Sequence, residues 1–195
     1  LKEGLIYDVE DMDAILNQFI SYMRDGSDEE IQDTDINMLL QELVVQFKPL
    51  DIRFKAEDIP VIQARSLSLK RLIGNLINNS KRYGAEPIEL SAKVENDHIF
   101  ISVADHGEGI PEDQIEDLMQ PFVRGNEART VQGSGLGLAI VKRIVDIHQG
   151  QLTLHNRPEG GLEALISLPI VQEKIEDNIH STTLGKIKQT FSERF

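Results

Sequence analysis

The stretch Gly133-Ser134-Gly135-Leu136-Gly137-Leu138 opens a long apolar helix, which the sequence predicts from about Leu136 to His148 with Gly150 as its stop. Its alternating glycines leave the first backbone N–H groups of the helix free of side chains. Such a helix start attracts anions, because its unpaired donors carry a positive partial charge. The stretch therefore predicts an anion site, although taken alone it could also be a glycine hinge.

Two familiar phosphate motifs do not fit this stretch. A P-loop needs a Lys followed by Ser or Thr at its end, and Leu138 follows Gly137 here. A dinucleotide fingerprint needs a third small residue and a preceding strand, whereas the polar run 124–135 comes before this helix. Neither a P-loop nor a Rossmann site is therefore expected.

A second polar pattern lies in the apolar helix predicted from Leu69 to Gly84. Asn75 and Asn79 are one helical turn apart, so their amides are expected to point the same way. Asn is costly in such a helix unless its amide has partners, and an amide oxygen suits Mg²⁺. Arg82, nearly one turn further on, could reach a phosphate. The alternative is a helix end whose Asn side chains are satisfied within the protein.

A third pattern, Asp105-His106-Gly107-Glu108-Gly109-Ile110, directly follows the strand predicted at 98–104. Gly107 and Gly109 allow a sharp turn and a close approach of the backbone to a ligand. Asp105 at the strand end could accept a hydrogen bond from an exocyclic amine. Taken alone, the pattern fits an ordinary Asp-containing turn better.

Around these patterns the sequence predicts a mixture of helices and antiparallel strands. Helices are expected at 35–47, with Asp35 as N-cap, and at 69–84, 111–119 and 136–148. Strands are expected around 52–54 and 61–62 and at 88–94, 98–104, 151–156 and 162–168, with a hairpin turn at Glu95-Asn96-Asp97. No regular βαβ repeat is present. We therefore predict an α+β fold: a two-layer α/β sandwich, with a mixed sheet covered by helices on one face.

The first 25 residues predict one long helix. Its apolar residues are spaced 4, 3, 4, 3 and 4 apart, which is a heptad seam: Leu5, Val9, Met12, Leu16, Phe19 and Met23. This seam needs an apolar partner, either the rest of the domain or a bundle or dimer. The 3.5-residue spacing favours the bundle or dimer. The polar run 25–30 is expected to end the helix and act as a linker.

Composition narrows the function further. The 195 residues carry 20 basic and 33 acidic side chains, a net charge of 20 − 33 = −13, which disfavours binding to nucleic acid. The absence of Cys excludes disulfides and thiolate metal sites. No apolar run reaches the length of a membrane-spanning helix. The sequence begins with Leu1, so we expect a piece of a longer protein.

The three patterns, in this order and on these elements, resemble the ATP-binding (Bergerat-fold) catalytic domain of sensor histidine kinases of two-component systems. That superfamily also includes gyrase, heat-shock chaperones and mismatch-repair ATPases. The run Pro121-Phe122-Val123-Arg124-Gly125 resembles the phenylalanine box of the kinase branch. The stretches 122–129 and 135–146 are similar to the EnvZ-type osmosensor kinases. The resemblance implies three parts: a partial dimerisation hairpin with linker at 1–30, the ATP-binding domain at 35–170, and a tail at 171–195.

The resemblance also implies roles for residues of this chain, with ATP and Mg²⁺ as cofactors. Asn79 would hold Mg²⁺ with Asn75 in support, and Arg82 would contact phosphate; Asn79 and Arg82 are thus the implied catalytic residues. The purine would meet Tyr83, Asp105, Gly107, Gly109 and Ile110. Arg124 and Gly125 would belong to a mobile lid over the nucleotide. The phosphates would meet backbone N–H groups of Ser134, Gly135, Leu136, Gly137 and Leu138.

The chain departs from the kinase pattern in one respect. The phosphoacceptor His is followed in the family by an acidic residue and a nearby Pro, and none of the five His residues fits: His98, His106, His148, His155 and His180. The resemblance then makes 1–25 the second helix of the dimerisation hairpin, and this chain is not expected to phosphorylate itself. A longer parent protein would be an inner-membrane homodimer with this part in the cytoplasm, anchored only through segments not present here, and a response regulator would be its partner.

Two other functions remain open at this point. In an ATPase clamp, ATP binding drives dimer closure, but such chains carry a catalytic Glu on the Asn-bearing helix, and 66–84 contains no acidic residue. In a degenerate kinase, the domain would only bind other proteins. The intact residues Asn79, Asp105, Gly135 and Gly137 argue against that alternative.

Overall fold

The computed structural model describes residues 16, 20, 28–123 and 134–170. Leu16 and Ile20 are helical and about half-exposed. The rest of the predicted helix at 1–25, the start of the predicted linker, the residues of the predicted lid at 124–133 and the tail at 171–195 lie outside the described residues. The domain boundaries near 30 and 170 therefore stay predictions.

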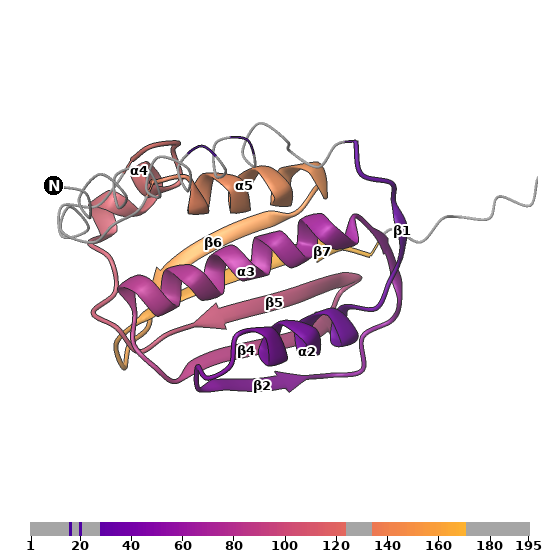
Figure 1. Ribbon diagram of the computed structural model, residues 1–195, viewed down its shortest axis with the longest axis horizontal. Coiled ribbons are helices and arrows are strands. Elements are labelled where there is room, and N and C mark those ends of the chain that lie inside the picture. The colour runs from indigo at the N-terminus through magenta and orange to yellow at the C-terminus, as the bar shows by residue number, and fades with distance from the viewer. Residues whose placement is uncertain (1–15, 17–19, 21–27, 124–133, 171–195) are drawn as a thin grey trace, which may run out of the picture.

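A five-stranded mixed sheet forms one layer of the fold (Figure 1). The strand order is β2 (Ile52–Ala56), β4 (Ile88–Glu95), β5 (His98–Ala104), β7 (Leu162–Pro169) and β6 (Gln151–Asn156). Only the β2–β4 pair is parallel, and the other three pairs are antiparallel. Asn96 and Asp97 both have positive φ and turn β4 into β5, as a two-residue hairpin requires.

Helices α2 (Ile36–Gln46), α3 (Ser66–Tyr83) and α5 (Gly137–Ile147) form the second layer, on one face of the sheet (Figure 1). A 3₁₀ turn, η1 (Glu112–Gln114), and the short helix α4 (Ile115–Leu118) occupy the predicted helix at 111–119. This two-layer α+β architecture confirms the predicted fold class. None of the helices in the described part of the chain is long and apolar enough to span a membrane.

The core lies between the two layers, and the apolar periodicities of the sequence place it there. Helix α3 buries five apolar residues at helical spacing: Leu69, Leu72, Ile73, Leu76 and Ile77. Alternate residues of β5, namely Ile99, Ile101 and Val103, are at most 2% exposed and meet the helices. At about 25 cal/mol per Å² of buried apolar area, this layer dominates the stability of the domain.

A small two-stranded sheet, of which the sequence predicts only the strand around 61–62, connects the start of the described chain to α3. Strand β1 (Gln32–Thr34) pairs antiparallel with β3 (Ile62–Ala64). Only Thr34 of β1 is buried, so the strand has no apolar alternation that could reveal it. Just before β1, the carboxylate of Glu29 accepts hydrogen bonds from the backbone N–H groups of Leu67 (2.7 Å) and Ser68 (2.9 Å). A residue of the predicted linker thus caps the N-terminus of α3.

His148, at the C-terminus of α5, contacts the residue that precedes α3. Its Nε2 accepts a hydrogen bond from the backbone N–H of Arg65 at 3.2 Å. Its Nδ1 lies 2.8 Å from the carbonyl oxygen of Ile144, so Nδ1 carries the proton of a neutral ring. Burial lowers the pKa of His148, and the nearby charge of Arg65 acts in the same direction.

Because the His148 ring is neutral in the folded chain, we expect the free energy of unfolding to fall in mild acid. Because the pKa of His148 is lower in the folded chain than in the unfolded chain, where it is about 6.5, the unfolded state binds the proton more readily. The stabilisation is present above that value and is lost as pH falls through it towards the lower folded pKa. We expect His148→Gln to lose less stability than the unsubstituted chain between pH 7.5 and 5.5, measured by urea unfolding at both pH values. Equal losses would contradict the role of this ring.

Candidate functional site

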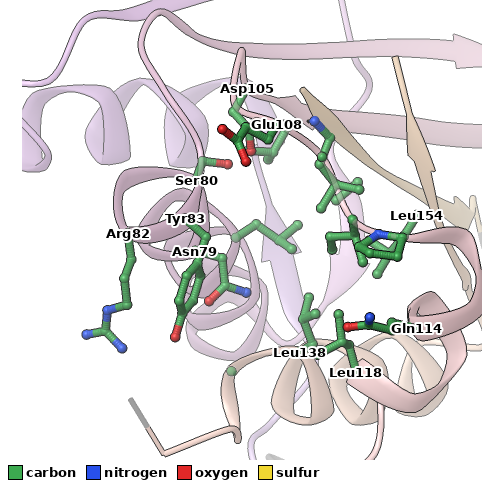
Figure 2. A pocket seen from close by; sticks show the side chains of 18 of the residues that line it. Asn79, Ser80, Arg82, Tyr83, Asp105, Glu108, Gln114, Leu118, Leu138 and Leu154 are labelled. Carbon is green, nitrogen blue, oxygen red and sulfur yellow. Dashed lines mark hydrogen bonds between the residues drawn. The ribbon is translucent and has the colours of Figure 1, made fainter. Parts of the chain in front are cut away.

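A cavity of about 530 Å³ opens between the C-terminal half of α3, the turn after β5, the α4 region and the start of α5 (Figure 2). This volume is in the range of pockets that hold small-molecule ligands. One wall is apolar, and it is formed by Leu76, Val103, Ile110, Leu118, Val123, Leu138, Leu154, Leu162 and Ala164. Polar groups stand at separate places on the rim, which is the arrangement that fixes a ligand's orientation.

Two buried polar residues line this cavity, Ser80 at 7% exposure and Asp105 at 5%, and of the two only Asp105 brings a carboxylate. Its Oδ1 accepts hydrogen bonds from the backbone N–H groups of Gly107 (3.0 Å) and Leu162 (3.1 Å). Its other oxygen, Oδ2, has no hydrogen-bond partner within the described residues. A buried acceptor of this kind is suited to a ligand that brings an N–H donor.

Three glycines make room for Asp105. A Cβ on Gly84 would lie 2.4 Å from Cγ of Asp105, and one on Gly107 would lie 2.7 Å from Cα of Gly84. A Cβ on Gly161 would lie 1.9 Å from the backbone oxygen of Asp105. Gly107 therefore serves the site by close packing behind Asp105, and it does not line the cavity.

The two Asn residues of α3 have different surroundings. Asn79 lines the cavity, and its amide makes no hydrogen bond within the part of the chain that the structure describes. Asn75 lies outside the lining, and its Nδ2 donates to the carbonyl oxygen of Arg71 at 3.0 Å. Asn79 therefore lies at the cavity, whereas Nδ2 of Asn75 is bonded within its own helix, and a shared role for the two amides stays a prediction.

The start of α5 faces Asn79 across the cavity. A Cβ on Gly137 would lie 3.1 Å from Oδ1 of Asn79, so the absence of a side chain keeps this approach open. Gly135 has a φ of +71°, a conformation that favours glycine. The N-cap residue Leu136 has no side chain that could cap the helix, so within the described residues the N–H groups of its first turn are open to an anion. Leu136 is fully buried in the core, and the Ser134 hydroxyl accepts a hydrogen bond from its N–H at 3.2 Å.

The remaining predicted residues differ in their position relative to the cavity. Arg82 and Tyr83 lie at the rim, at the exposed end of α3, and Figure 2 shows Arg82 pointing away from the cavity. The cavity lining also includes Gly109, Ile110, Gly135, Gly137 and Leu138. Ser134, like Leu136, is not part of it. Arg124 and Gly125 lie outside the described residues. The structure thus brings nine predicted residues of all three sequence patterns to one cavity.

Sequence reasoning missed most of the apolar wall. Leu154, Leu162 and Ala164 come from β6 and β7, between 49 and 59 positions beyond Asp105. Their alternation predicts a buried strand face, but alternation gives no sign that one end of that face lines a cavity. Gln114 and Leu118, from η1 and α4, carry no motif at all.

A divalent cation in this cavity would need most of its coordinating atoms from the bound small molecule. The described residues contain no group of three or more His, Cys, Asp or Glu side chains that could hold a metal. The amide oxygen of Asn79 is a single hard donor, which fits Mg²⁺ held mainly by phosphates and water. The site therefore fits a cation that arrives with a polyphosphate.

With this geometry described, comparison with known proteins becomes informative. Residues 64–172, more than half of the chain, match the family model described as histidine kinase-, DNA gyrase B- and HSP90-like ATPase. The sensor histidine kinase GtrS of Pseudomonas aeruginosa is 33% identical over 175 residues, which cover 87% of this chain and 36% of that protein. The sensor protein KdpD of Escherichia coli is 37% identical over 115 residues, 58% of this chain and 13% of that protein. This chain thus spans about a third or less of the length of these relatives.

Solved structures agree with this picture. The histidine kinase domain of the E. coli osmosensor EnvZ is 38% identical with a TM-score of 0.57, covering 73% of this chain and 89% of that one. The catalytic domain of the histidine kinase ThkA is 26% identical with a TM-score of 0.65, covering 72% of this chain and 96% of that one. Full-length ShkA, solved in complex with AMPPNP, has a TM-score of 0.72 at 23% identity, over 82% of this chain and 36% of that one, and shares the fold.

The packing around Asp105 gives a test with a matched control. Gly160 and Gly161 both have positive φ, +97° and +96°, but a Cβ on Gly160 would meet nothing closer than 3.7 Å. Both Ala substitutions therefore strain the backbone, and only Gly161→Ala also collides with Asp105. We expect Gly161→Ala to cost about 2 kcal/mol or more beyond Gly160→Ala in urea unfolding. Equal costs would show that the Asp105 turn does not depend on this contact.

Proposed function

This chain belongs to the histidine kinase-, DNA gyrase B- and HSP90-like ATPase family, and on that premise we propose that it is the ATP-binding catalytic part of a sensor histidine kinase. The observation that supports this most is the pairing of two features in one cavity. The first is Oδ2 of the buried residue Asp105, an acceptor without a partner in the described residues, and the second is the start of α5 beside Asn79. A purine amine and a polyphosphate are the groups that these two features suit.

In this proposal the purine occupies the apolar part of the cavity. Oδ2 of Asp105 accepts a hydrogen bond from the adenine amino group, because Oδ1 is already occupied by two backbone N–H groups. Gly109 and Ile110 shape the turn above the ring, and Tyr83 covers its edge from the end of α3.

The phosphates lie towards α5. The N–H groups of Gly135, Gly137 and Leu138 donate to them, and the neighbouring backbone of Ser134 and Leu136 completes this loop. Mg²⁺ bound to the triphosphate supplies neutralisation of its charge, and the amide oxygen of Asn79 holds it, with Asn75 in a supporting role. Arg82, exposed at the rim, can turn inwards to a phosphate oxygen. The chain's part in phosphoryl transfer is thus positioning and charge balance.

The wider role of the protein belongs to the same proposal. The γ-phosphoryl group passes to a His of a dimerisation segment and from there to an Asp of a response regulator. The 38% identity to the EnvZ kinase domain supports an osmosensor-like, EnvZ-type kinase. The homodimer, the cytoplasmic position below an inner membrane and the division into hairpin (1–30), catalytic domain (35–170) and tail (171–195) rest on this resemblance.

A specific observation favours transfer to a His over hydrolysis in an ATPase clamp. Helix α3, which carries Asn79, contains no Asp or Glu along its 18 residues. This helix therefore offers no carboxylate beside Asn79 that could act as a general base on water.

The first test is calorimetric titration of this chain with AMPPNP, with and without Mg²⁺. We expect Mg²⁺-dependent binding that Asn79→Ala weakens by about 10- to 100-fold, the scale of one lost contact to a charged group. Asn75→Ala is the matched control, one turn away and bonded to its own helix, and it should weaken binding far less. If the folded chain does not bind AMPPNP, or if both substitutions act alike, the assignment of the site is wrong.

A second measurement tests the reaction itself. The chain is incubated with γ-labelled ATP and a separately supplied dimerisation hairpin of an EnvZ-type kinase. Transfer of label to the hairpin His is expected. Release of free phosphate without labelled hairpin would favour the ATPase clamp.

A further inference from the structure

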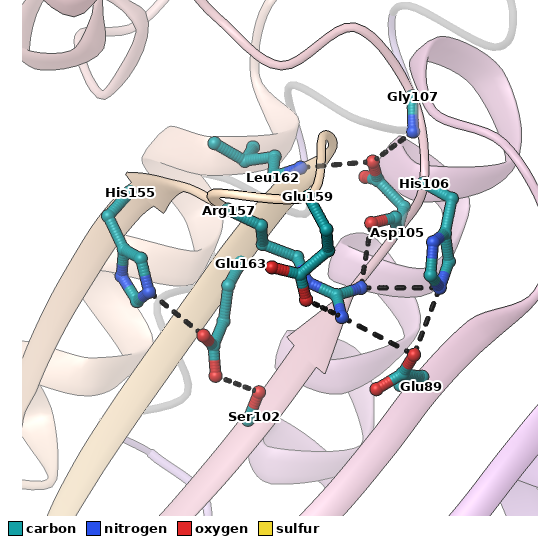
Figure 3. A network of polar contacts seen from close by, with 10 residues as sticks. All are labelled: Glu89, Ser102, Asp105, His106, Gly107, His155, Arg157, Glu159, Leu162 and Glu163. Atoms are coloured by element: carbon teal, nitrogen blue, oxygen red, sulfur yellow. Dashed lines mark hydrogen bonds and ion pairs between the residues drawn. The ribbon is translucent and has the colours of Figure 1, made fainter.

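The turn that carries Asp105 is held from outside the cavity by the connection between β6 and β7 (Figure 3). The backbone N–H of Asp105 donates to the carbonyl oxygen of Leu162 at 3.0 Å, and the N–H of Leu162 returns a bond to the carboxylate. The connection is itself closed by a bond from the N–H of Arg157 to the carbonyl oxygen of Gly161, at 2.9 Å. The turn and the connection are therefore in direct backbone contact.

Arg157 adds a side-chain bond to the beginning of this turn. Its Nη1 donates to the backbone oxygen of Asp105 at 3.1 Å, and its side chain is only 11% exposed. Its Nη2 donates to Glu159 at 2.6 Å and to Glu89 at 3.4 Å (Figure 3). Bonds from His106 and Arg157 lower the pKa of Glu89, so this carboxylate stays ionised and helps to orient the guanidinium.

Asn156 holds the other end of the turn. Its Oδ1 accepts a bond from the N–H of Ile110 at 2.8 Å, and its Nδ2 donates to the carbonyl oxygen of Ile110 at 2.7 Å. The amide thus replaces a strand neighbour for Ile110, satisfying both of its backbone groups. Gly109, with φ +81°, lets this amide approach, because a Cβ there would lie 2.4 Å from Oδ1 of Asn156.

Neither Asn156 nor Arg157 lines the cavity, whereas Asp105 and Ile110, the residues that they hold, both do. Because these two side chains fix both ends of the six-residue turn, they determine the position of the turn residues that face the cavity. A carboxylate that must meet a ligand donor within a few tenths of an ångström is sensitive to such support.

We propose that Asn156 and Arg157 are positioning residues for the purine end of the nucleotide site. This inference rests on the proposed function, because it takes the ligand of Asp105 to be an adenine nucleotide. The two side chains touch no ligand. They act by keeping Asp105 and Ile110 in the binding geometry before the nucleotide arrives, so their loss lowers affinity through a looser turn.

The test combines hydrogen exchange without nucleotide and calorimetry with AMPPNP and Mg²⁺. In Asn156→Ala, the amide of Ile110 is expected to exchange at least about tenfold faster, while core amides such as those of Ile101 and Ile166 keep their rates. AMPPNP affinity should fall about tenfold. His155→Ala is the matched control, since the preceding side chain contacts Glu163 at 2.9 Å and not the turn.

A conservative pair of substitutions separates positioning from general stability. Arg157→Lys retains one donor for the backbone oxygen of Asp105, whereas Arg157→Met retains none and has a similar length. Both variants are compared in a background that also carries Glu89→Gln and Glu159→Gln, which removes the two carboxylates that pair with residue 157. In that background we expect similar melting temperatures and tighter binding of AMPPNP by the Lys variant than by the Met variant.

Each outcome bears on a different claim. Faster exchange at Ile110 with unchanged AMPPNP affinity overturns the positioning role, and so does an equal loss of affinity in His155→Ala. Failure of the unsubstituted chain to bind AMPPNP overturns the proposed function and this inference with it. Binding by the unsubstituted chain with unaffected variants overturns this inference alone.

Discussion

The carboxylate of Asp105 is the point on which the site depends. It is buried, and one of its oxygens is bonded to two backbone N–H groups, from the turn that follows it and from the start of β7. That arrangement joins the ends of two adjacent strands and leaves the other oxygen for a ligand. Gly84, Gly107 and Gly161 are there because any larger residue would enter the space of Asp105 or its turn. A buried charge is costly unless it is fully partnered, so these contacts are as much a requirement of folding as of binding.

Two kinds of secondary structure form the two sides of the cavity. Its Asp105 side is made of paired strands and a turn held at both ends, so the acceptor and the apolar wall are set by the sheet. Its Asn79 side is made of two helix ends, with few side-chain bonds within the described residues. This division matches the ligand that we propose: a rigid aromatic ring needs a fixed slot, whereas a polyphosphate with its cation can adapt to backbone donors.

Local patterns in the sequence predict the helices and strands. They do not predict the parts of the site that depend on contacts between distant positions. The spacing of Leu69, Leu72 and Leu76 predicted α3, and the alternation of Ile99, Ile101 and Val103 predicted β5. The glycines and Asn79 could be found because their chemistry is unusual for their elements. Nothing local distinguishes Asn156 from any polar residue at a strand end, because its partner Ile110 is 46 positions away. Glu29 was assigned to a linker for the same reason, since its partners on α3 lie 38 and 39 positions further on. The pairing of Asn75 with Asn79 stays a prediction, because helical spacing gives the direction of an amide and does not show which partners it has within its own helix.

The bonds between Glu29 and the first turn of α3 attach the segment before β1 to the helix that carries Asn79. The chain arrives from its N-terminal side at Glu29, which grips the N–H groups of Leu67 and Ser68. Asn79 sits on the same stiff rod, about 16 Å away at 1.5 Å per residue. The segment before β1 and the residue at the cavity are thus attached to opposite ends of one helix, so a change in the position of Glu29 acts on the helix that carries Asn79 and not directly on the strands that hold Asp105.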